Sequence, residues 1–337
     1  MDEAKVSKAA QMVAVVIGRN EGKQLAASFE SVRAAGLPLV YVDSGSSDGS
    51  SGLARNAGIP TLELDPARPF SAARARNEGL EEAGRRWPDA RFALFLDGDC
   101  ELDAGFPPAA AHTFAQHPDC AIVTGHLTER APDASVYNRL CAIEWRSPAG
   151  KIENFGALGG IMAVRISAIR AVGGFNEQVI AGEDSELGVR LALAGKTVFK
   201  IDRPMATHDA RIMRFREWWK RSVRAGHSFA QRFALNGRTP LRDCRRELIS
   251  AILWGFVVPF VVLVLLWPTG GWSLLLLGGY GLLAWRVYRY YRGSGASPTD
   301  AATATRFMLY SKFANFLGVL TFCLNWLRGS FRIIEYK

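Results

Sequence analysis

The chain has 337 residues, of which 49% are hydrophobic and 22% charged. This composition excludes a disordered, collagen-like or coiled-coil protein, and the length suffices to bury one large core or two smaller ones. The formal net charge of +9 indicates an anionic partner, for which phosphorylated substrates, acidic lipid headgroups and nucleic acid are the candidates. Five scattered cysteines without a Cys-x-x-Cys pair are typical of a reducing compartment, not of a disulfide framework or a zinc site of paired cysteines.

Residues 1–11 are polar and are expected to form an N-terminal tail that contains no signal peptide and stays in the cytoplasm. Residues 12–210 then alternate short apolar runs with helical stretches and polar turns, which predicts an α/β domain. The predicted strands are 12–17, 38–42 and 91–96, with shorter strands at 61–64 and 121–123.

Each of the three longer predicted strands ends in a polar turn. These turns are Gly18-Arg19-Asn20-Glu21, Asp43-Ser44-Gly45 and Asp97-Gly98-Asp99. Because the carboxyl ends of strands in an open parallel sheet line the ligand crevice, the three turns predict one binding site.

The Asp97-Gly98-Asp99 turn is the sharpest local feature. Two carboxylates one residue apart can share a hard divalent cation, with water and phosphate oxygens in the other positions. The glycine between them lets the backbone approach a ligand closely. The alternative interpretation is an ordinary solvent-exposed acidic turn.

Two earlier motifs suit a nucleotide. The turn that begins at Asp43 and runs to Gly49 can hold a base or ribose, although Ser47 or Asp48 can instead cap a helix there. Arg76, followed by Asn77 at the start of a predicted helix, suits a diphosphate, with a plain surface arginine as the alternative. No Walker loop or Gly-x-Gly-x-x-Gly motif is present, so a nucleotide would depend on metal and side chains.

A glycine-rich stretch, 156–164, precedes an acidic pair, Glu183-Asp184. The apolar spacing after the pair predicts that both acids head a helix, where they oppose its dipole favourably. The functional alternative is that one of them is a general base.

In this order, the motifs resemble glycosyltransferase family 2, whose members invert the anomeric configuration and have a GT-A fold. The resemblance covers residues 12–208, and one departure is Ser44, where many members have a second acid after Asp43. It implies the following residue roles. Arg19, Asn20, Glu21, Asp43, Arg76, Asn77 and Asp97 bind the nucleotide; Asp97, Asp99 and His208 hold Mn²⁺ or Mg²⁺; and Asp184, beside Glu183, is the general base.

The same resemblance implies a direct displacement with a nucleotide-sugar donor, most often UDP-linked. The Gln-x-x-Arg-Trp motif of processive members is missing from 215–224, so we expect transfer of a single sugar. The layout is similar to bacterial enzymes of exopolysaccharide and cell-surface glycan assembly, including the succinoglycan-type group. A lipid-linked or glycan acceptor follows from that likeness.

Residues 211–247 are basic and rich in aromatics, which favours amphipathic helices on a membrane surface with anionic headgroups over a solvated basic helix. Arg221 and Arg224 are candidates for the phosphates of a lipid-linked acceptor.

Residues 248–292 are predicted to form a transmembrane hairpin. The uncharged run Ile249 to Trp267 has 19 residues, which reach about 28 Å, close to one hydrocarbon core. Arginines flank the hairpin on both sides and none lies in its connection, so both ends are expected on the cytoplasmic side of a bacterial inner membrane. Residues 293–337 are read as a linker and a last helix, 307–327, interfacial in preference to a third span.

Three other functions were weighed. Transfer to polyprenyl phosphate itself, as in dolichol-phosphate-mannose-type synthases, is an alternative within the enzyme class, and a non-catalytic scaffold with the same fold is another. A nucleic-acid-binding protein is disfavoured because the basic charge lies beside apolar runs. Sugar, acceptor and linkage are not determined by the sequence, and a homo-oligomer remains open.

Overall fold

The structure, a computed structural model, describes residues 11–155 and 158–329. Residues 1–10 of the predicted tail, Gly156 and Ala157 of the glycine-rich stretch, and 330–337 of the last predicted segment lie outside the described residues. The chain forms two compact units. Of the described residues, the first contains 11–130, 148–155, 158–178 and 182–209, and the second contains 131–147, 179–181 and 210–329.

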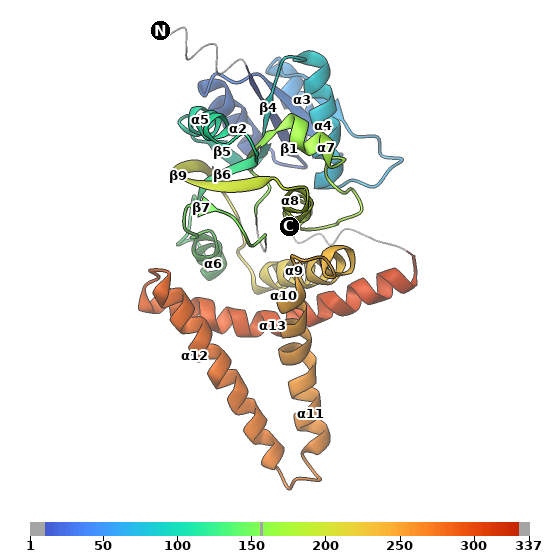
Figure 1. Cartoon of the computed structure of the whole chain (residues 1–337), viewed down its shortest axis with the longest axis vertical. Helices are drawn as coiled ribbons and strands as arrows, with labels where there is room; N and C mark the ends of the chain where they lie inside the picture. The colour runs from blue at the N-terminus through green and yellow to red at the C-terminus, as the bar shows by residue number, and fades with distance from the viewer. Residues whose placement is uncertain (1–10, 156–157, 330–337) are drawn as a thin grey trace. The chain divides into compact units, whose positions relative to one another are not determined.

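The first unit is built on one nine-stranded mixed sheet (Figure 1). The strands are β1 (Met12–Gly18), β2 (Leu39–Asp43), β3 (Thr61–Glu63), β4 (Phe92–Asp97), β5 (Cys100–Leu102), β6 (Cys120–Glu129), β7 (Gly150–Lys151), β8 (Met162–Arg165) and β9 (Thr197–His208). Their order is β3-β2-β1-β4-β8-β6-β9-β5, and β7 pairs with β9. The α/β fold class is thus confirmed, and all five predicted strands are present.

The sheet is parallel on one side and mixed on the other. Strands β1 to β4 are parallel to one another, β8 runs antiparallel to β4 and β6, and β9 is parallel to β6 but antiparallel to β5. The register places Gly18 beside Asp43 and Ile17 beside Asp97, so the polar turns after β1, β2 and β4 begin next to one another. This confirms that the three turns share one edge of the sheet.

Helices cover both faces of this sheet, which explains why its central strands are continuous apolar runs. Met12, Ala14 and Val16 of β1 pack in one core with α2 (Lys23–Ala34), α3 (Ser50–Asn56) and α5 (Phe106–Gln116). Val13, Val15 and Ile17 pack in the other core with α4 (Ala72–Arg86), α7 (Ile166–Ala171) and α8 (Glu183–Leu193). A Cβ on Gly79 of α4 would lie 2.4 Å from Val15 Cγ1, so this helix needs a glycine to sit close to the sheet.

The second unit is helical. Its elements are α6 (Val136–Glu144), α9 (Phe215–Asn236), α10 (Arg245–Ile252), a π-helical turn η1 (Leu253–Val257), α11 (Val258–Leu265), a 3₁₀ turn η2 (Trp272–Leu277), α12 (Gly278–Gly293) and α13 (Pro298–Leu327). The π turn comes just before Pro259, whose ring would clash with the carbonyl four residues earlier in a regular α-helix.

Helices α9 and α13 cross in backbone contact. A Cβ on Gly226 would lie 2.0 Å from the Asn315 carbonyl oxygen, and one on Gly318 would lie 2.0 Å from the Val223 carbonyl oxygen. Only glycine permits an approach this close at either position.

Helix α9 also holds the short segment 179–181, which belongs to the same unit. Ser228 Oγ donates to the Ala181 carbonyl at 2.7 Å, and Arg224 donates to the Ile180 carbonyl at 3.1 Å. Gln231 Oε1 accepts from the Ile180 amide at 3.3 Å. Three side chains of one helix therefore fix the backbone that immediately precedes Gly182.

Figure 1 shows α11 and α12 as the two arms of a hairpin, with α13 running across the arms away from their connection. Two helical stretches are long and apolar enough to cross a membrane, 245–265 with a mean hydropathy of 2.7 and Pro298–Leu327 with 1.5. This test concerns length and composition alone.

Candidate functional site

The acidic turn after β4 is tied to the end of β1. The Gly98 amide donates to the Ile17 carbonyl at 2.8 Å. A Cβ on Gly98 would lie 3.0 Å from Glu21 Cγ and 3.3 Å from the Ile17 carbonyl oxygen. Glycine between Asp97 and Asp99 therefore serves the packing of this turn.

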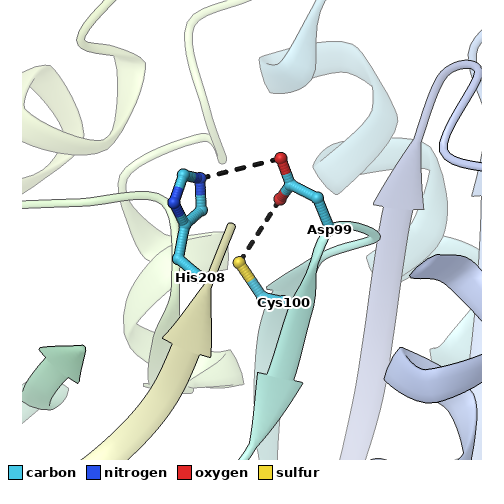
Figure 2. Close-up of side chains that lie close together, drawn as sticks. All are labelled: Asp99, Cys100 and His208. Atoms are coloured by element: carbon cyan, nitrogen blue, oxygen red, sulfur yellow. Dashed lines mark hydrogen bonds and ion pairs between the residues drawn. The ribbon is translucent and has the colours of Figure 1, made fainter. Parts of the chain in front are cut away.

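Asp99 and His208 come together with Cys100, as Figure 2 shows. His208 Nε2 lies 3.6 Å from Asp99 Oδ2, and Cys100 Sγ donates to Asp99 Oδ1 at 3.3 Å. Potential ligand atoms of the three residues all lie within 4.8 Å of one another. An imidazole nitrogen beside a carboxylate is a donor set that fits a divalent metal ion such as Mn²⁺.

Strand pairing explains this cluster. Cys100 of β5 is the register partner of His208 of β9, although 107 residues separate them in the chain. Glu129 at the end of β6 pairs with His208 from the other side, and its Oε2 lies 3.4 Å from His208 Nδ1. The Glu129 side chain is fully buried.

Arg76 joins two of the predicted site acids. Its Nη2 donates to Asp97 Oδ1 at 3.0 Å and its Nη1 donates to Glu183 Oε1 at 2.5 Å. The arginine is 2% exposed, and its Nε has no hydrogen-bond partner within the described part of the chain. A Cβ on Gly160 would lie 2.2 Å from Arg76 Nη2, so the glycine-rich stretch passes directly over the guanidinium.

Glu183 and Asp184 begin α8, as predicted, after Gly182 in the left-handed conformation (φ +74°). Asp184 Oδ2 accepts from the Gly159 amide at 2.5 Å and from Ser185 Oγ at 3.2 Å. Burial and then the neighbouring Glu183 raise the pKa of Asp184, while Arg76 opposes the rise. A buried carboxylate whose proton affinity is raised is suited to general-base chemistry.

The Asp43 turn is internally bonded. Asp43 Oδ1 accepts from the Gly45 and Ser46 amides at 2.9 and 2.7 Å, and Oδ2 accepts from the Tyr41 hydroxyl at 2.9 Å. Burial raises the pKa of Tyr41, with a further rise from Asp43, so the phenol keeps the proton that it donates. Asp43 therefore shapes the turn.

Asn20 connects the first turn to the second. Its backbone amide donates to Ser46 Oγ at 2.9 Å, and its Oδ1 accepts from the Ser47 amide at 2.8 Å. The N-cap of α3 is Gly49, so neither Ser47 nor Asp48 caps that helix; Asp48 Oδ1 instead accepts from the Ser50 amide at 3.0 Å.

The other predicted nucleotide-binding residues are placed differently. Arg19 is exposed, with its guanidinium carbon 5.7 Å from the centre of the Phe70 ring, and Glu21 packs against the acidic turn. Asn77 is bonded to Phe175, whose carbonyl and amide lie 2.9 and 2.8 Å from its side-chain nitrogen and oxygen. Asn77 therefore makes a structural contact with the backbone of Phe175, which no local motif in the sequence indicates.

In the second unit, the two arginines predicted for lipid phosphates have protein partners. Arg221 forms an ion pair with Glu144 at 2.9 Å, and Arg224 donates to the Ile180 carbonyl. Cys100 and Glu129, by contrast, were not predicted as site residues. The position of Cys100 next to Asp99 is the one sequence feature that could have indicated Cys100 as a site residue. No local motif indicates Glu129.

Comparison with known proteins places this chain in a family. The model of glycosyl transferase family group 2 matches residues 94–289, more than half of the chain, and that of glycosyl transferase family 2 matches residues 13–172. A curated relative, the succinoglycan biosynthesis protein ExoA of Rhizobium meliloti (strain 1021), is 28% identical over 277 residues, 78% of this chain and 82% of the relative.

Two solved structures have a similar fold. The mannosyltransferase PcManGT from Pyrobaculum calidifontis, in complex with GDP-Man and Mn²⁺, matches with a TM-score of 0.60 and 18% identity over 91% of this chain and 87% of its own. TarS 1-349 of S. aureus matches with a TM-score of 0.50 and 13% identity, over 97% and 95% of the two chains. These structures share the fold, and because a family model matches more than half of its residues, the chain belongs to the family 2 glycosyltransferases.

Proposed function

We propose that this glycosyltransferase moves one sugar from a nucleotide-diphospho-sugar, preferably UDP-linked, to a lipid-linked or cell-surface glycan acceptor, with inversion at the anomeric carbon. The observation that carries the proposal is Arg76, whose single buried guanidinium bonds both Asp97 and Glu183. It joins the acidic turn predicted to bind the donor to the acid beside the predicted base, Asp184.

Donor binding is assigned to the turns at the ends of β1, β2 and β4. The Asp43 turn is held in shape by four hydrogen-bonded groups and is cross-linked to Asn20, which suits a rigid pocket for a base and ribose. The buried Arg76 Nε–H, which has no partner among the described residues, is a donor for a diphosphate oxygen.

Asp99 and His208 are the residues assigned to a divalent cation, with Asp97 beside them. A bound Mn²⁺ or Mg²⁺ would neutralise charge on the departing nucleoside diphosphate. The complex of PcManGT with GDP-Man and Mn²⁺ supports such a cation in a chain of similar fold.

Asp184 is assigned as the general base. The bonds from Gly159 and Ser185 Oγ both end on Oδ2, so Oδ1 is the oxygen proposed to take the proton. The acceptor hydroxyl loses that proton as its oxygen bonds to the anomeric carbon, and the bond from that carbon to the nucleoside diphosphate breaks. The proton ends on Asp184, and the electron pair leaves with the diphosphate.

The acceptor and the location are proposed from the second unit and the curated relative. The relative's role in succinoglycan biosynthesis supports a glycan assembled at a bacterial membrane. An anchor with α13 at the interface is supported by the apolar stretch 245–265, the hairpin form of α11 and α12, and the crosswise path of α13 (Figure 1). The first unit is assigned to the cytoplasmic side because arginines flank the hairpin at both of its ends.

Calorimetric titration of the full-length, detergent-solubilised protein with UDP and GDP, with and without Mn²⁺, tests the donor site. We expect Mn²⁺-dependent binding of UDP, lost in Asp99→Ala. Asp202→Ala, an exposed position on the same strand as His208, is the matched control and should bind as the wild type does. Binding of neither nucleotide by folded protein would overturn the proposal, and preference for GDP would correct the donor.

A further inference from the structure

We propose that Cys100 completes a three-residue site with Asp99 and His208 that binds Zn²⁺, in competition with the harder cation of the transfer reaction. The competition between cations rests on the proposed function, because that function assigns the same two residues, Asp99 and His208, to Mn²⁺ or Mg²⁺. Zinc would then act as an inhibitor of this enzyme, and Cys100 would determine how strongly.

The potential ligand atoms of this cluster are gathered closely enough for one zinc ion. Zn–S bonds of about 2.3 Å and Zn–N or Zn–O bonds of about 2.0–2.1 Å give edges of roughly 3.3–3.6 Å in a tetrahedral site. Cys100 Sγ lies 3.3 Å from Asp99 Oδ1, and His208 Nε2 lies 3.6 Å from Oδ2, the other oxygen of the same carboxylate. One ligand atom from each of the three residues lies within 4.8 Å of the other two, so small side-chain rotations would bring one Asp99 oxygen, the sulfur and the nitrogen around a single ion. Figure 2 shows the thiol and the imidazole on two sides of the Asp99 carboxylate.

The backbone holds the three ligands in place. Cys100 and His208 are directly paired residues of antiparallel strands, and Asp99 is the residue before Cys100. Cys100 is fully buried and Asp99 is 8% exposed, so neither side chain has room to swing away. Three ligands leave the fourth tetrahedral position for water or a phosphate oxygen.

The chemistry of the thiol separates the two kinds of cation. Mn²⁺ and Mg²⁺ prefer oxygen ligands, whereas a thiolate binds Zn²⁺ strongly. Binding transfers the thiol proton to solvent and forms a Zn–S bond, without oxidation or reduction. The buried Cys120 offers no such site within the described ranges, since its Sγ donates to the Ile122 carbonyl at 3.3 Å and it lies outside the cluster.

The absorption spectrum of bound Co²⁺ shows directly whether the Cys100 thiolate is a metal ligand. Full-length protein in detergent, without nucleotide, is titrated with Co²⁺, and Zn²⁺ affinity is measured by competition with a chromogenic chelator. We expect a near-ultraviolet sulfur-to-cobalt charge-transfer band in the wild type that is absent from Cys100→Ser. Zn²⁺ affinity should fall by about 10-fold or more in Cys100→Ser, and by at least 10-fold more than Mn²⁺ affinity does. Cys120→Ser is the control and should keep both the band and the affinity.

An unchanged band and unchanged Zn²⁺ affinity in Cys100→Ser would overturn the proposal. If Cys100→Ser does not fold, Cys100→Ala and the Co²⁺ spectrum of the wild type answer the same question, because no thiolate band in the wild type also overturns it. The outcome is independent of the donor site. A cobalt band in protein that binds neither UDP nor GDP would keep the zinc site and reject the proposed function.

Discussion

His208 Nδ1 lies 3.4 Å from Glu129 Oε2, while the other ring nitrogen, Nε2, lies 3.6 Å from Asp99 Oδ2. With a proton on Nδ1 facing the buried Glu129 carboxylate, the Nε2 lone pair would be available to a metal ion beside Asp99. Metal-binding histidines in proteins are commonly oriented in this way.

Glu129→Gln is therefore expected to weaken Mn²⁺ binding by about 10- to 100-fold without removing a ligand. Calorimetric titration with Mn²⁺ measures the effect. Glu101→Gln, on strand β5 at the other side of β9 and with a partly exposed side chain, is the control and should bind Mn²⁺ normally. Equal affinities in wild type and Glu129→Gln would remove Glu129 from any positioning role.

Asp184→Asn should lower kcat by about 10²- to 10⁴-fold, the range for loss of a general base, and leave folding and UDP affinity largely intact. Initial-rate kinetics with a nucleotide-sugar, together with UDP titration, separate the two effects. Glu186→Gln, which changes the acid paired with Arg190 on the same helix, provides the comparison. Near-normal turnover in Asp184→Asn would refute the base assignment.

Arg76→Met should destabilise the first unit by about 3–5 kcal/mol, since it leaves Asp97 and Glu183 without their shared cation, and should abolish donor binding. Arg74→Met is a matched control on α4. Arg74 is equally buried and pairs with Glu78 at 2.6 Å, so this variant should lose stability but keep UDP affinity in the folded fraction. Chemical denaturation measures the stability of the two variants, and UDP titration measures their donor affinity. Retained UDP binding in Arg76→Met would contradict the assignment of Arg76 to the donor diphosphate.

Because His227 is buried, we expect the free energy of unfolding to decrease in acid. It is fully buried in α9, neither ring nitrogen has a hydrogen-bond partner among the described residues, and burial lowers its pKa from 6.5 to about 4. Between these two values the unfolded chain binds the proton and the folded chain does not, so stability falls as the pH drops below 6.5. The loss should reach about 3 kcal/mol near pH 4.

His227→Leu should remove this component. Unfolding free energies measured from pH 7.5 down to pH 4.5 should fall more steeply for the wild type than for His227→Leu, with His112→Gln as the control on a different helix. Parallel pH profiles for wild type and His227→Leu would mean that His227 contributes nothing to acid sensitivity.

The sequence was most informative where structure is local. Apolar runs that end in polar turns predicted the strands β1, β2 and β4 and the shared edge of Asp43 and Asp97, because buried parallel strands have that pattern. The helix start at Glu183 followed from the spacing of apolar residues after it.

The contacts that complete the site depend on long-range pairing. His208 meets Cys100 and Glu129 only because β9 lies between β5 and β6, and no local pattern determines that order. Arg76 was predicted as a phosphate ligand, but its ion pair with Glu183 spans 107 residues and could not be derived from spacing. The side chain of the adjacent Asn77 forms hydrogen bonds with the backbone of Phe175.

The glycine crossing of α9 and α13 has a mechanical consequence. Since backbone touches backbone at Gly226 and Gly318, no side chain can rotate to absorb a shift of one helix against the other, and the two helices must tilt as one body. Three side chains of α9 bind the backbone of residues 179–181, and Gly182 and α8 follow in the chain. A displacement of α13 would therefore be transmitted through α9 to the backbone of residues 179–181.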